Sequence, residues 1–121
     1  MKIYTTYFGN LTNLPDSVVP IAVCGSCKFW NGLRYKALAP KYWWWKIWKD
    51  EGMDTDYYTK MYKTTVLDTL IPLSVVRDLE TLSGGKDVAL VCYEVPSAFC
   101  HRHLIASWLN EAGYNVEEWI N

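Results

Sequence analysis

Residues 92–103 contain two cysteines, two histidines, an arginine and a glutamate. A thiolate can act as a nucleophile or bind a metal, and an imidazole can exchange a proton near neutral pH. A guanidinium can bind an anion or pair with a carboxylate. These residue types are therefore compatible with a catalytic site, a metal site, or a hydrogen-bonded start of a helix.

Two predicted elements position this segment. The short apolar run 88–93 predicts a buried central strand. Ser97 is a suitable cap for a helix from about Ala98 to Ala112, which Gly113 ends. The polar side chains thus follow the carboxyl end of a strand and open a helix, where α/β proteins place ligands.

The helical phase separates the neighbouring side chains. At roughly 100° per residue, His101 lies on the face that packs on the sheet. Cys100 and Arg102 lie on its two flanks, and His103 points to solvent. With Ser97 as the cap, Cys100 is the third helical residue, where the positive end of the helix stabilises a thiolate.

We predict that the cluster at the strand end and helix start is catalytic. In this hypothesis Arg102 and the helix start bind an anion, a cysteine is the nucleophile, and His101 is the general acid or base. The predicted catalytic residues are Cys92, Glu94, Cys100, His101 and Arg102. The structural alternatives are a small core residue for Cys92, a buried hydrogen-bonded His101, and an Arg102–Glu94 pair. No metal is assigned to this cluster.

The C-terminal third resembles the family called domain of unknown function 488 (DUF488). The family signature is a strand ending in Cys-x-Glu and then Cys-His-Arg at the start of a helix, here 92–94 and 100–102. The segments KIYTTYFGN and NGLRYKALAP also resemble the opening strand of the family and a short subgroup of it. The resemblance implies an α/β domain with the site at the five residues named above.

A weaker, architectural resemblance is to rhodanese-like sulfurtransferases, in which a cysteine follows a central strand. Cys92 would be the matching thiol. The loop that follows reads VPSAF and lacks the glycine-rich anion cradle of that group.

A Cys-x-x-Cys motif, Cys24 to Cys27, follows the second predicted strand. The spacing is that of half a zinc site or of a redox pair, and unrelated thiols are the third reading. Zinc at Cys24 and Cys27 is the alternative to having no cofactor. The remaining ligands would have to come from the C-terminal cluster, because the chain has no second Cys-x-x-Cys.

The segment KYWWWKIWKD, residues 41–50, combines aromatic and basic side chains on a helix that follows Pro40. Its rings cover more than one side of the helix. They could close the core, form a homodimer interface, or stack on nucleobases beside the lysines. The candidate ligand-binding residues in this half of the chain are Arg34, Lys41 and Trp45.

The remaining patterns complete an α/β fold. They predict strands over 2–8, 18–24 and 116–120 and helices over 40–48, 55–70 and 72–82, with irregular chain at 25–40. This order indicates one domain, 1–121, with a mixed, mostly parallel sheet flanked by helices and a C-terminal β-α-β unit.

Composition limits the functions that fit. The chain has 121 residues and a net charge of −1, which does not suit a general nucleic-acid binder, although 28–49 contains basic residues and no acidic ones. No apolar run could span a membrane, so we expect a cytoplasmic protein whose four cysteines are thiols or metal ligands rather than disulfides. The leading prediction is an enzyme-like protein that binds an anionic ligand, a nucleotide or nucleic acid. The alternative is a non-catalytic nucleic-acid or protein-binding module that uses residues 28–49.

Overall fold

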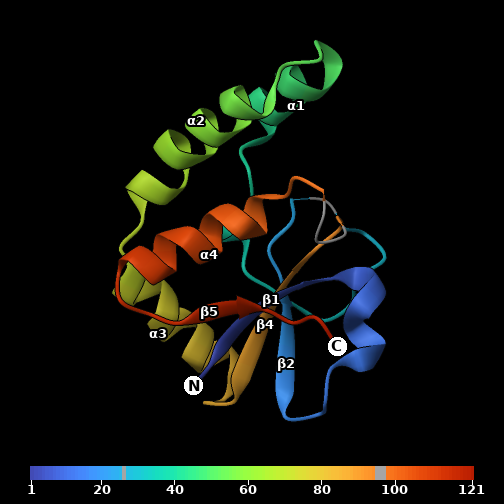
Figure 1. The fold of residues 1–121 in the computed structure, drawn as a ribbon, viewed down its shortest axis with the longest axis vertical. Coiled ribbons are helices and arrows are strands. Elements are labelled where there is room, and N and C mark those ends of the chain that lie inside the picture. Colours follow the sequence, from blue (N-terminus) through green and yellow to red (C-terminus); the bar gives the residue numbers. More distant parts are fainter. Residues whose placement is uncertain (26, 95–97) are drawn as a thin grey trace.

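The computed structural model describes residues 1–25, 27–94 and 98–121, which form a sheet with helices packed against it (Figure 1). The strands are β1 (Ile3–Tyr7), β2 (Val18–Ala22), β3 (Leu33–Arg34), β4 (Asp87–Cys92) and β5 (Val116–Glu118). The helices are α1 (Tyr42–Asp50), α2 (Thr55–Thr65), α3 (Pro72–Ser83) and α4 (His101–Glu111). Short 3₁₀ helices η1 (Phe8–Asn13), η2 (Lys36–Leu38) and η3 (Leu67–Thr69) lie between them.

The sheet has the strand order β3-β2-β4-β1-β5, and every pairing among the described strands is parallel. β4 is central: it pairs with β1 so that Cys92 lies opposite Tyr7, and with β2 so that Leu90 lies opposite Ile21. Because all strands run the same way, their carboxyl ends meet at one edge of the sheet. That edge receives the loops that carry the predicted site.

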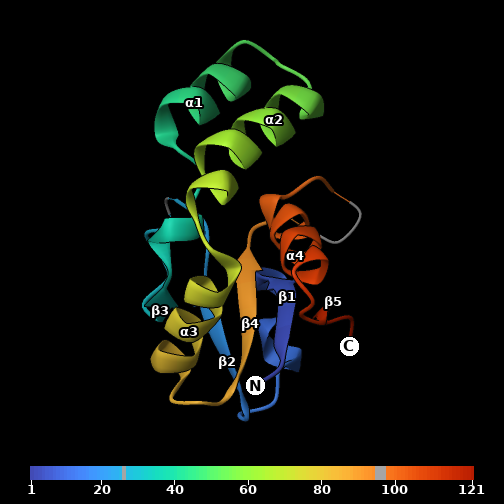
Figure 2. The same ribbon diagram turned by 90° about the vertical axis from the view of Figure 1, so that its left-hand side faces the viewer.

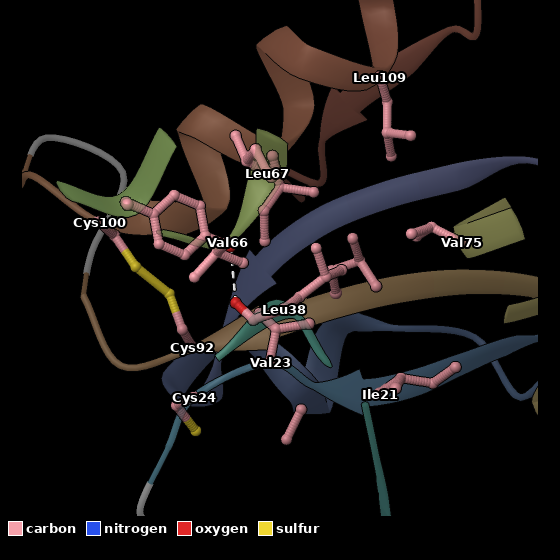
Figure 3. Packing of buried hydrophobic residues seen from close by; sticks show 14 of the residues in the cluster. Ile21, Val23, Cys24, Leu38, Val66, Leu67, Val75, Cys92, Cys100 and Leu109 are labelled. Atoms are coloured by element: carbon pink, nitrogen blue, oxygen red, sulfur yellow. Dashed lines mark hydrogen bonds between the residues drawn. A yellow bond between two sulfur atoms is a disulfide. The ribbon is translucent and has the colours of Figure 1, made fainter. Parts of the chain in front are cut away.

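The core lies between the sheet and two helices on one of its faces (Figure 2). Leu79 of α3 and Ile105 of α4 pack in the same apolar cluster as Ile21 and Leu90 of the sheet. All four side chains are fully buried, and Figure 3 shows Ile21 with other members of this cluster. Strand β4 is buried nearly throughout, which explains its continuous apolar sequence. The core therefore fixes the end of β4 relative to the start of α4.

Helices α1 and α2 form a hairpin beyond the carboxyl edge of the sheet (Figure 1). Aromatic contacts hold it: the ring of Trp44 meets Tyr58 edge-on at 4.9 Å, and the Trp44 indole donates to Thr65 at 2.8 Å. The Tyr62 hydroxyl donates to the Leu38 carbonyl oxygen at 2.6 Å. Trp44 of α1 is therefore part of the core, and other aromatic side chains of this helix can line a cavity.

The predicted α/β class and the C-terminal β-α-β unit are confirmed, and several details differ. The described sheet is fully parallel, not mixed, because each of its pairings joins strands that run the same way. A short strand, β3, also forms in the chain predicted to be irregular. The helix predicted to reach Leu70 ends at Thr65 and is followed by η3. None of the helices in the described parts of the chain has the length and apolar character needed to cross a membrane.

Candidate active site at the carboxyl edge of the sheet

A cavity of about 670 Å³ opens where the ends of β2 and β4 meet the α1–α2 hairpin and the start of α4. Its position is the one that parallel α/β sheets use for ligands, and its size fits a small molecule. We call it the edge cavity. Its lining residues are Cys24, Gly25, Lys36, Ala39, Pro40, Tyr42, Trp45, Trp48, Lys49, Tyr58, Cys92, Tyr93, Glu94, Phe99, Cys100 and His101.

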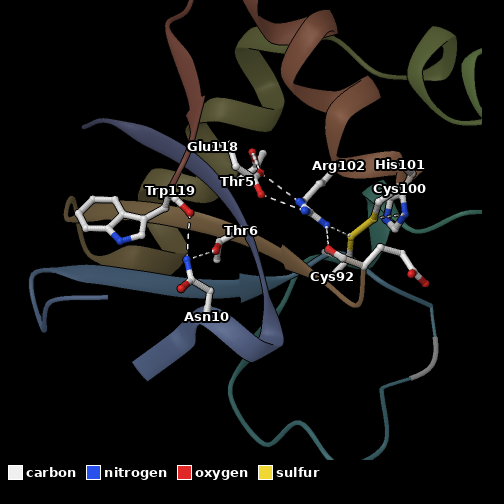
Figure 4. Close-up of polar contacts among 10 residues, drawn as sticks. Thr5, Thr6, Asn10, Cys92, Cys100, His101, Arg102, Glu118 and Trp119 are labelled. Atoms are coloured by element: carbon white, nitrogen blue, oxygen red, sulfur yellow. Dashed lines mark hydrogen bonds and ion pairs between the residues drawn. A yellow bond between two sulfur atoms is a disulfide. The ribbon is translucent and has the colours of Figure 1, made fainter. Parts of the chain in front are cut away.

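A disulfide between Cys92 and Cys100 forms one part of the wall (Figures 3 and 4). Cys92 is the last residue of β4, and Cys100 is the residue before α4. The prediction that the cysteines are thiols or metal ligands rather than disulfides is therefore wrong for this pair. The two residues are eight positions apart, and the end of β4 and the start of α4 bring them together.

The start of α4 differs from the prediction. The helix begins at His101, and Cys100 is the N-cap residue with extended backbone, φ −151° and ψ 145°. It is therefore not the third helical residue. Ser97, the predicted cap, lies outside the described residues. The Cys100 side chain makes no capping hydrogen bond, which is expected because its sulfur is bonded to Cys92.

His101 is directed inward, as its helical phase predicted, and is 5% exposed. Its Nε2 lies 2.8 Å from the Val23 carbonyl oxygen. A carbonyl can only accept, so we assign the ring proton to Nε2, and Nδ1 is left with a lone pair. Nδ1 lies 3.9 Å from the Cys100 sulfur. Burial lowers the pKa of His101 from 6.5 to about 4, so the ring is neutral near neutral pH.

Arg102 is 0% exposed, and its carboxylate partner is Glu118 of β5 (Figure 4). Its Nε and Nη2 donate to the two Glu118 oxygens at 3.1 and 2.9 Å. Its Nη1 donates to the Glu94 main-chain oxygen at 2.6 Å and to the Cys92 sulfur at 3.4 Å. Because these bonds occupy the guanidinium inside the protein, Arg102 supports the wall of the cavity and does not line it.

The predicted Arg102–Glu94 pair is therefore made through the backbone of Glu94, whose exposed side chain is at the edge cavity. Glu118 was not a predicted site residue. The available signal was a carboxylate in the predicted last strand, which the β-α-β unit returns to the sheet beside β1. Thr5 of β1 also donates to Glu118 at 2.6 Å.

His103 does not lie in open solvent, which corrects the prediction from helical phase. Its side chain is partly covered, and Nε2 is buried without a hydrogen-bond partner among the described residues. Burial lowers the pKa of His103, and the positive charge of Arg102 acts in the same direction. The helical wheel gives only the direction of a side chain relative to the sheet, whereas α4 also contacts α2.

Aromatic rings from three segments form the apolar wall of the edge cavity. Tyr58 of α2 meets Trp48 of α1 and Phe99 edge-on, each at 4.9 Å between ring centroids. Trp45, a predicted ligand-binding residue, also lines the cavity, and the ammonium group of Lys49 lies 5.1 Å from its ring centroid. Sequence reasoning did not single out the other rings, because they meet only through the fold of the hairpin.

The basic residues at the cavity are Lys36 and Lys49. Lys41 is exposed at the start of α1 and is not among the lining residues. Arg34 is held by the preceding loop: it donates to the Cys27 sulfur at 3.0 Å, to the Cys27 carbonyl oxygen at 2.7 Å and to the Trp30 carbonyl oxygen. The structure therefore gathers Trp45 but not Arg34 or Lys41 at the site.

Cys24 and Cys27 are buried free thiols. Burial, with Cys27 beside it, raises the pKa of Cys24 to about 12. Across the described residues, the one group of three or more potential metal ligands within mutual reach is Cys92, Cys100 and His101. The Cys-x-x-Cys motif does not belong to that group.

A family model described as the active DUF488-N3 subclade matches residues 14–113 of the chain. The match spans the edge cavity and both halves of the Cys-x-Glu and Cys-His-Arg signature. No curated protein and no solved structure matches the chain. The architectural likeness to rhodanese-like proteins is therefore not shown.

Proposed function

The chain belongs to the DUF488 family, and from this premise we propose that it is a small enzyme-like protein that binds an anionic, planar aromatic ligand of the nucleotide class in the edge cavity. The observation that carries the proposal is the pairing of an aromatic wall with a reactive wall in one cavity of about 670 Å³. The description of the matching subclade as active agrees with a catalytic role. The cytoplasm is the proposed location.

The aromatic wall supports a planar ligand. Trp45 and Trp48 line the cavity from α1, and Tyr58, which contacts both Trp48 and Phe99 edge-on, continues the same wall. Stacking a base on an aromatic side chain contributes about 1–3 kcal/mol and tolerates different bases. The wall therefore suits a nucleobase without selecting one base.

Two lysines and the start of α4 support an anionic group. Lys36 of η2 and Lys49 of α1 line the cavity, as do Cys100 and His101 at the start of α4. Amide groups in the first turn of a helix favour phosphate, and the helix dipole adds to this. Arg102, which the sequence assigned to the anion, instead neutralises Glu118.

The reactive wall would act in its dithiol form. A thiol reductant in the cytoplasm can cleave the Cys92–Cys100 bond by supplying two electrons and two protons. The lone pair on His101 Nδ1 then faces the Cys100 thiol and can accept its proton, while Arg102 donates to the Cys92 sulfur. In this role Cys100 is the nucleophile, His101 is the base and Arg102 is a positioning residue.

Quenching of tryptophan fluorescence by nucleoside 5′-monophosphates tests the binding. Trp45→Ala should weaken binding about tenfold, because one stacking surface is lost. Trp43→Ala is the matched control, since Trp43 is the neighbour on α1, is 58% exposed and does not line the cavity. The proposal is overturned if Trp45→Ala and Trp43→Ala weaken nucleotide binding equally, or if neither variant changes the affinity.

A second candidate function uses the outer surface of α1. Tyr42 and Trp43 are 68% and 58% exposed, and Lys46 lies on the same helix. Such a surface could bind single-stranded nucleic acid without catalysis. In that case Trp43→Ala should weaken binding of a short oligonucleotide, and Trp45→Ala should weaken it less. A shift to monomer in the Trp43→Ala variant would instead identify the surface as a homodimer interface.

A further inference from the structure

We propose that the dithiol form of the protein binds a zinc ion through Cys92, Cys100 and His101, with the fourth coordination position open to the edge cavity. The sequence alone assigns no metal to these residues. The proposal stands apart from nucleotide binding, because it concerns only the reduced state of the reactive wall.

The three ligand atoms are already gathered. The two sulfur atoms and a ring nitrogen of His101 lie within 4.8 Å of one another, and all three residues are buried. Zn–S distances are about 2.3 Å and Zn–N distances about 2.0 Å, so ligand atoms around a tetrahedral zinc stand roughly 3.5–3.8 Å apart. Once the disulfide is cleaved, small side-chain rotations of the two cysteines are enough to reach this spacing.

The backbone around the ligands is held by the core. Cys92 ends the central strand β4, and the next two ligands open α4, whose residues Ile105 and Leu109 are fully buried. A site whose ligands come from packed elements loses little conformational freedom when it binds an ion. This distinguishes the cluster from the Cys-x-x-Cys motif, which lies in a loop and has only two ligands.

The hydrogen bonds around the cluster suit a metal. Histidine ligands of metals generally donate their other ring N–H to a carbonyl or carboxylate. His101 does this with Nε2, which lies 2.8 Å from the Val23 oxygen, and Nδ1 is thereby left as the ligand atom. Arg102 Nη1 lies 3.4 Å from the Cys92 sulfur and would stabilise its thiolate.

The fourth position gives the site its chemistry. Cys92, Cys100 and His101 all line the edge cavity, and no described carboxylate belongs to the ligand group. A zinc site with three protein ligands and one open position binds water or substrate and acts as a Lewis acid. The geometry therefore assigns this zinc a place in contact with whatever occupies the edge cavity.

Zinc and the disulfide exclude each other. Two electrons and two protons from a phosphine or thiol reductant convert the disulfide to two thiols, and zinc then displaces those two protons. Oxidation by a disulfide oxidant removes two electrons from the thiolates, forms the S–S bond and releases the ion. Metal content should therefore follow the redox state of this cysteine pair.

Titration with Co²⁺ tests the site in the full chain. After reduction with a phosphine and removal of the reductant under nitrogen, Co²⁺ should give thiolate-to-cobalt charge-transfer absorption and the intense visible bands of tetrahedral cobalt. Zn²⁺ should abolish both. Cys92→Ser, Cys100→Ser and His101→Ala should each weaken binding at least tenfold, whereas the double variant Cys24→Ser/Cys27→Ser should bind like the wild type.

The oxidised wild type is the control that needs no mutation, and it should show no cobalt bands. The proposal is overturned if the reduced protein shows no bands, if the oxidised protein shows the same bands, or if only the Cys24→Ser/Cys27→Ser variant loses them. Nucleotide binding is measured on the oxidised, metal-free protein. The two proposals therefore fail independently.

Discussion

The two cysteine pairs lie at the ends of neighbouring strands and differ in almost every respect. Cys24 and Cys27 follow β2, have the spacing of a redox or zinc motif, and remain free thiols. Cys92 and Cys100 are eight positions apart, and they form the disulfide. The familiar spacing thus belongs to the pair that does not form the disulfide.

The surroundings of the pairs explain the difference. His101 places a ring nitrogen 3.9 Å from Cys100, and Arg102 donates to Cys92, so both sulfurs have polar neighbours. Burial and the neighbouring Cys27 raise the pKa of the Cys24 thiol to about 12, and the arginine of this pair, Arg34, donates to the Cys27 sulfur. Motif spacing predicts which residues are near in the chain, whereas reactivity depends on which side chains the fold adds.

Alkylation of the reduced, metal-free protein should separate the two pairs most strongly. At pH 7.5 iodoacetamide should modify Cys100 about a thousandfold faster than Cys24, because a thiol with a pKa near 12 forms very little thiolate. Peptide mass spectrometry over time gives the rates. Comparable alkylation rates at Cys100 and Cys24 would contradict the difference in reactivity between the two cysteine pairs.

The supporting arginines should differ in their effect on stability. Arg102→Ala should lower the free energy of unfolding by about 3–5 kcal/mol, because it leaves the charge of Glu118 without its partner. Arg34→Ala, which removes only bonds to Cys27 and Trp30 at a partly exposed position, should cost about 1 kcal/mol. Urea unfolding measures both, and equal losses would contradict the account.

Acid should weaken the fold through His101. Its pKa is about 4 in the folded protein and 6.5 when unfolded, so below pH 6.5 the unfolded chain binds a proton that the folded chain does not. The free energy of unfolding should fall by about 1.4 kcal/mol for each pH unit between 6.5 and 4. His101→Gln, which can still donate to Val23, should reduce this slope. An unchanged slope would mean that other groups cause it.

Reduction of the disulfide should have a smaller effect on stability than the loss of Arg102. The Cys92–Cys100 bond closes a short loop, so a phosphine reductant should lower the free energy of unfolding by about 2 kcal/mol. A Cys24→Ser/Cys27→Ser variant should show the same response, and a Cys92→Ser/Cys100→Ser variant should show none. If the Cys24→Ser/Cys27→Ser variant lost this response to the reductant, the assignment of the disulfide to Cys92 and Cys100 would be contradicted.

Sequence patterns predicted the framework of the site better than its contacts. Strand β4 and the inward direction of His101 follow from apolar runs and helical period, which are local properties. The Glu118 partner of Arg102 depends on the return of β5 to the far side of β1, and the partial burial of His103 depends on the tertiary packing around α4. A local sequence pattern contains neither the order of the strands nor the packing around α4.

The edge cavity could be predicted only in part, for the same reason. The position of Trp45 followed from an aromatic and basic helix, but its neighbours Tyr58 and Phe99 come from separate segments that the hairpin brings together. The start of α4 was misplaced by several residues because Cys100, bonded to Cys92, is extended. A disulfide between distant positions has no local signature.

Protection of Cys100 from alkylation is the most direct test of the central claim, that one cavity holds both the ligand and the reactive sulfur. With the reduced, metal-free protein, a saturating nucleoside 5′-monophosphate should slow modification of Cys100 at least tenfold, and Trp45→Ala should remove the protection at the same nucleotide concentration. Saturable nucleotide binding with an unchanged rate at Cys100 would show that the ligand binds elsewhere and would contradict the account.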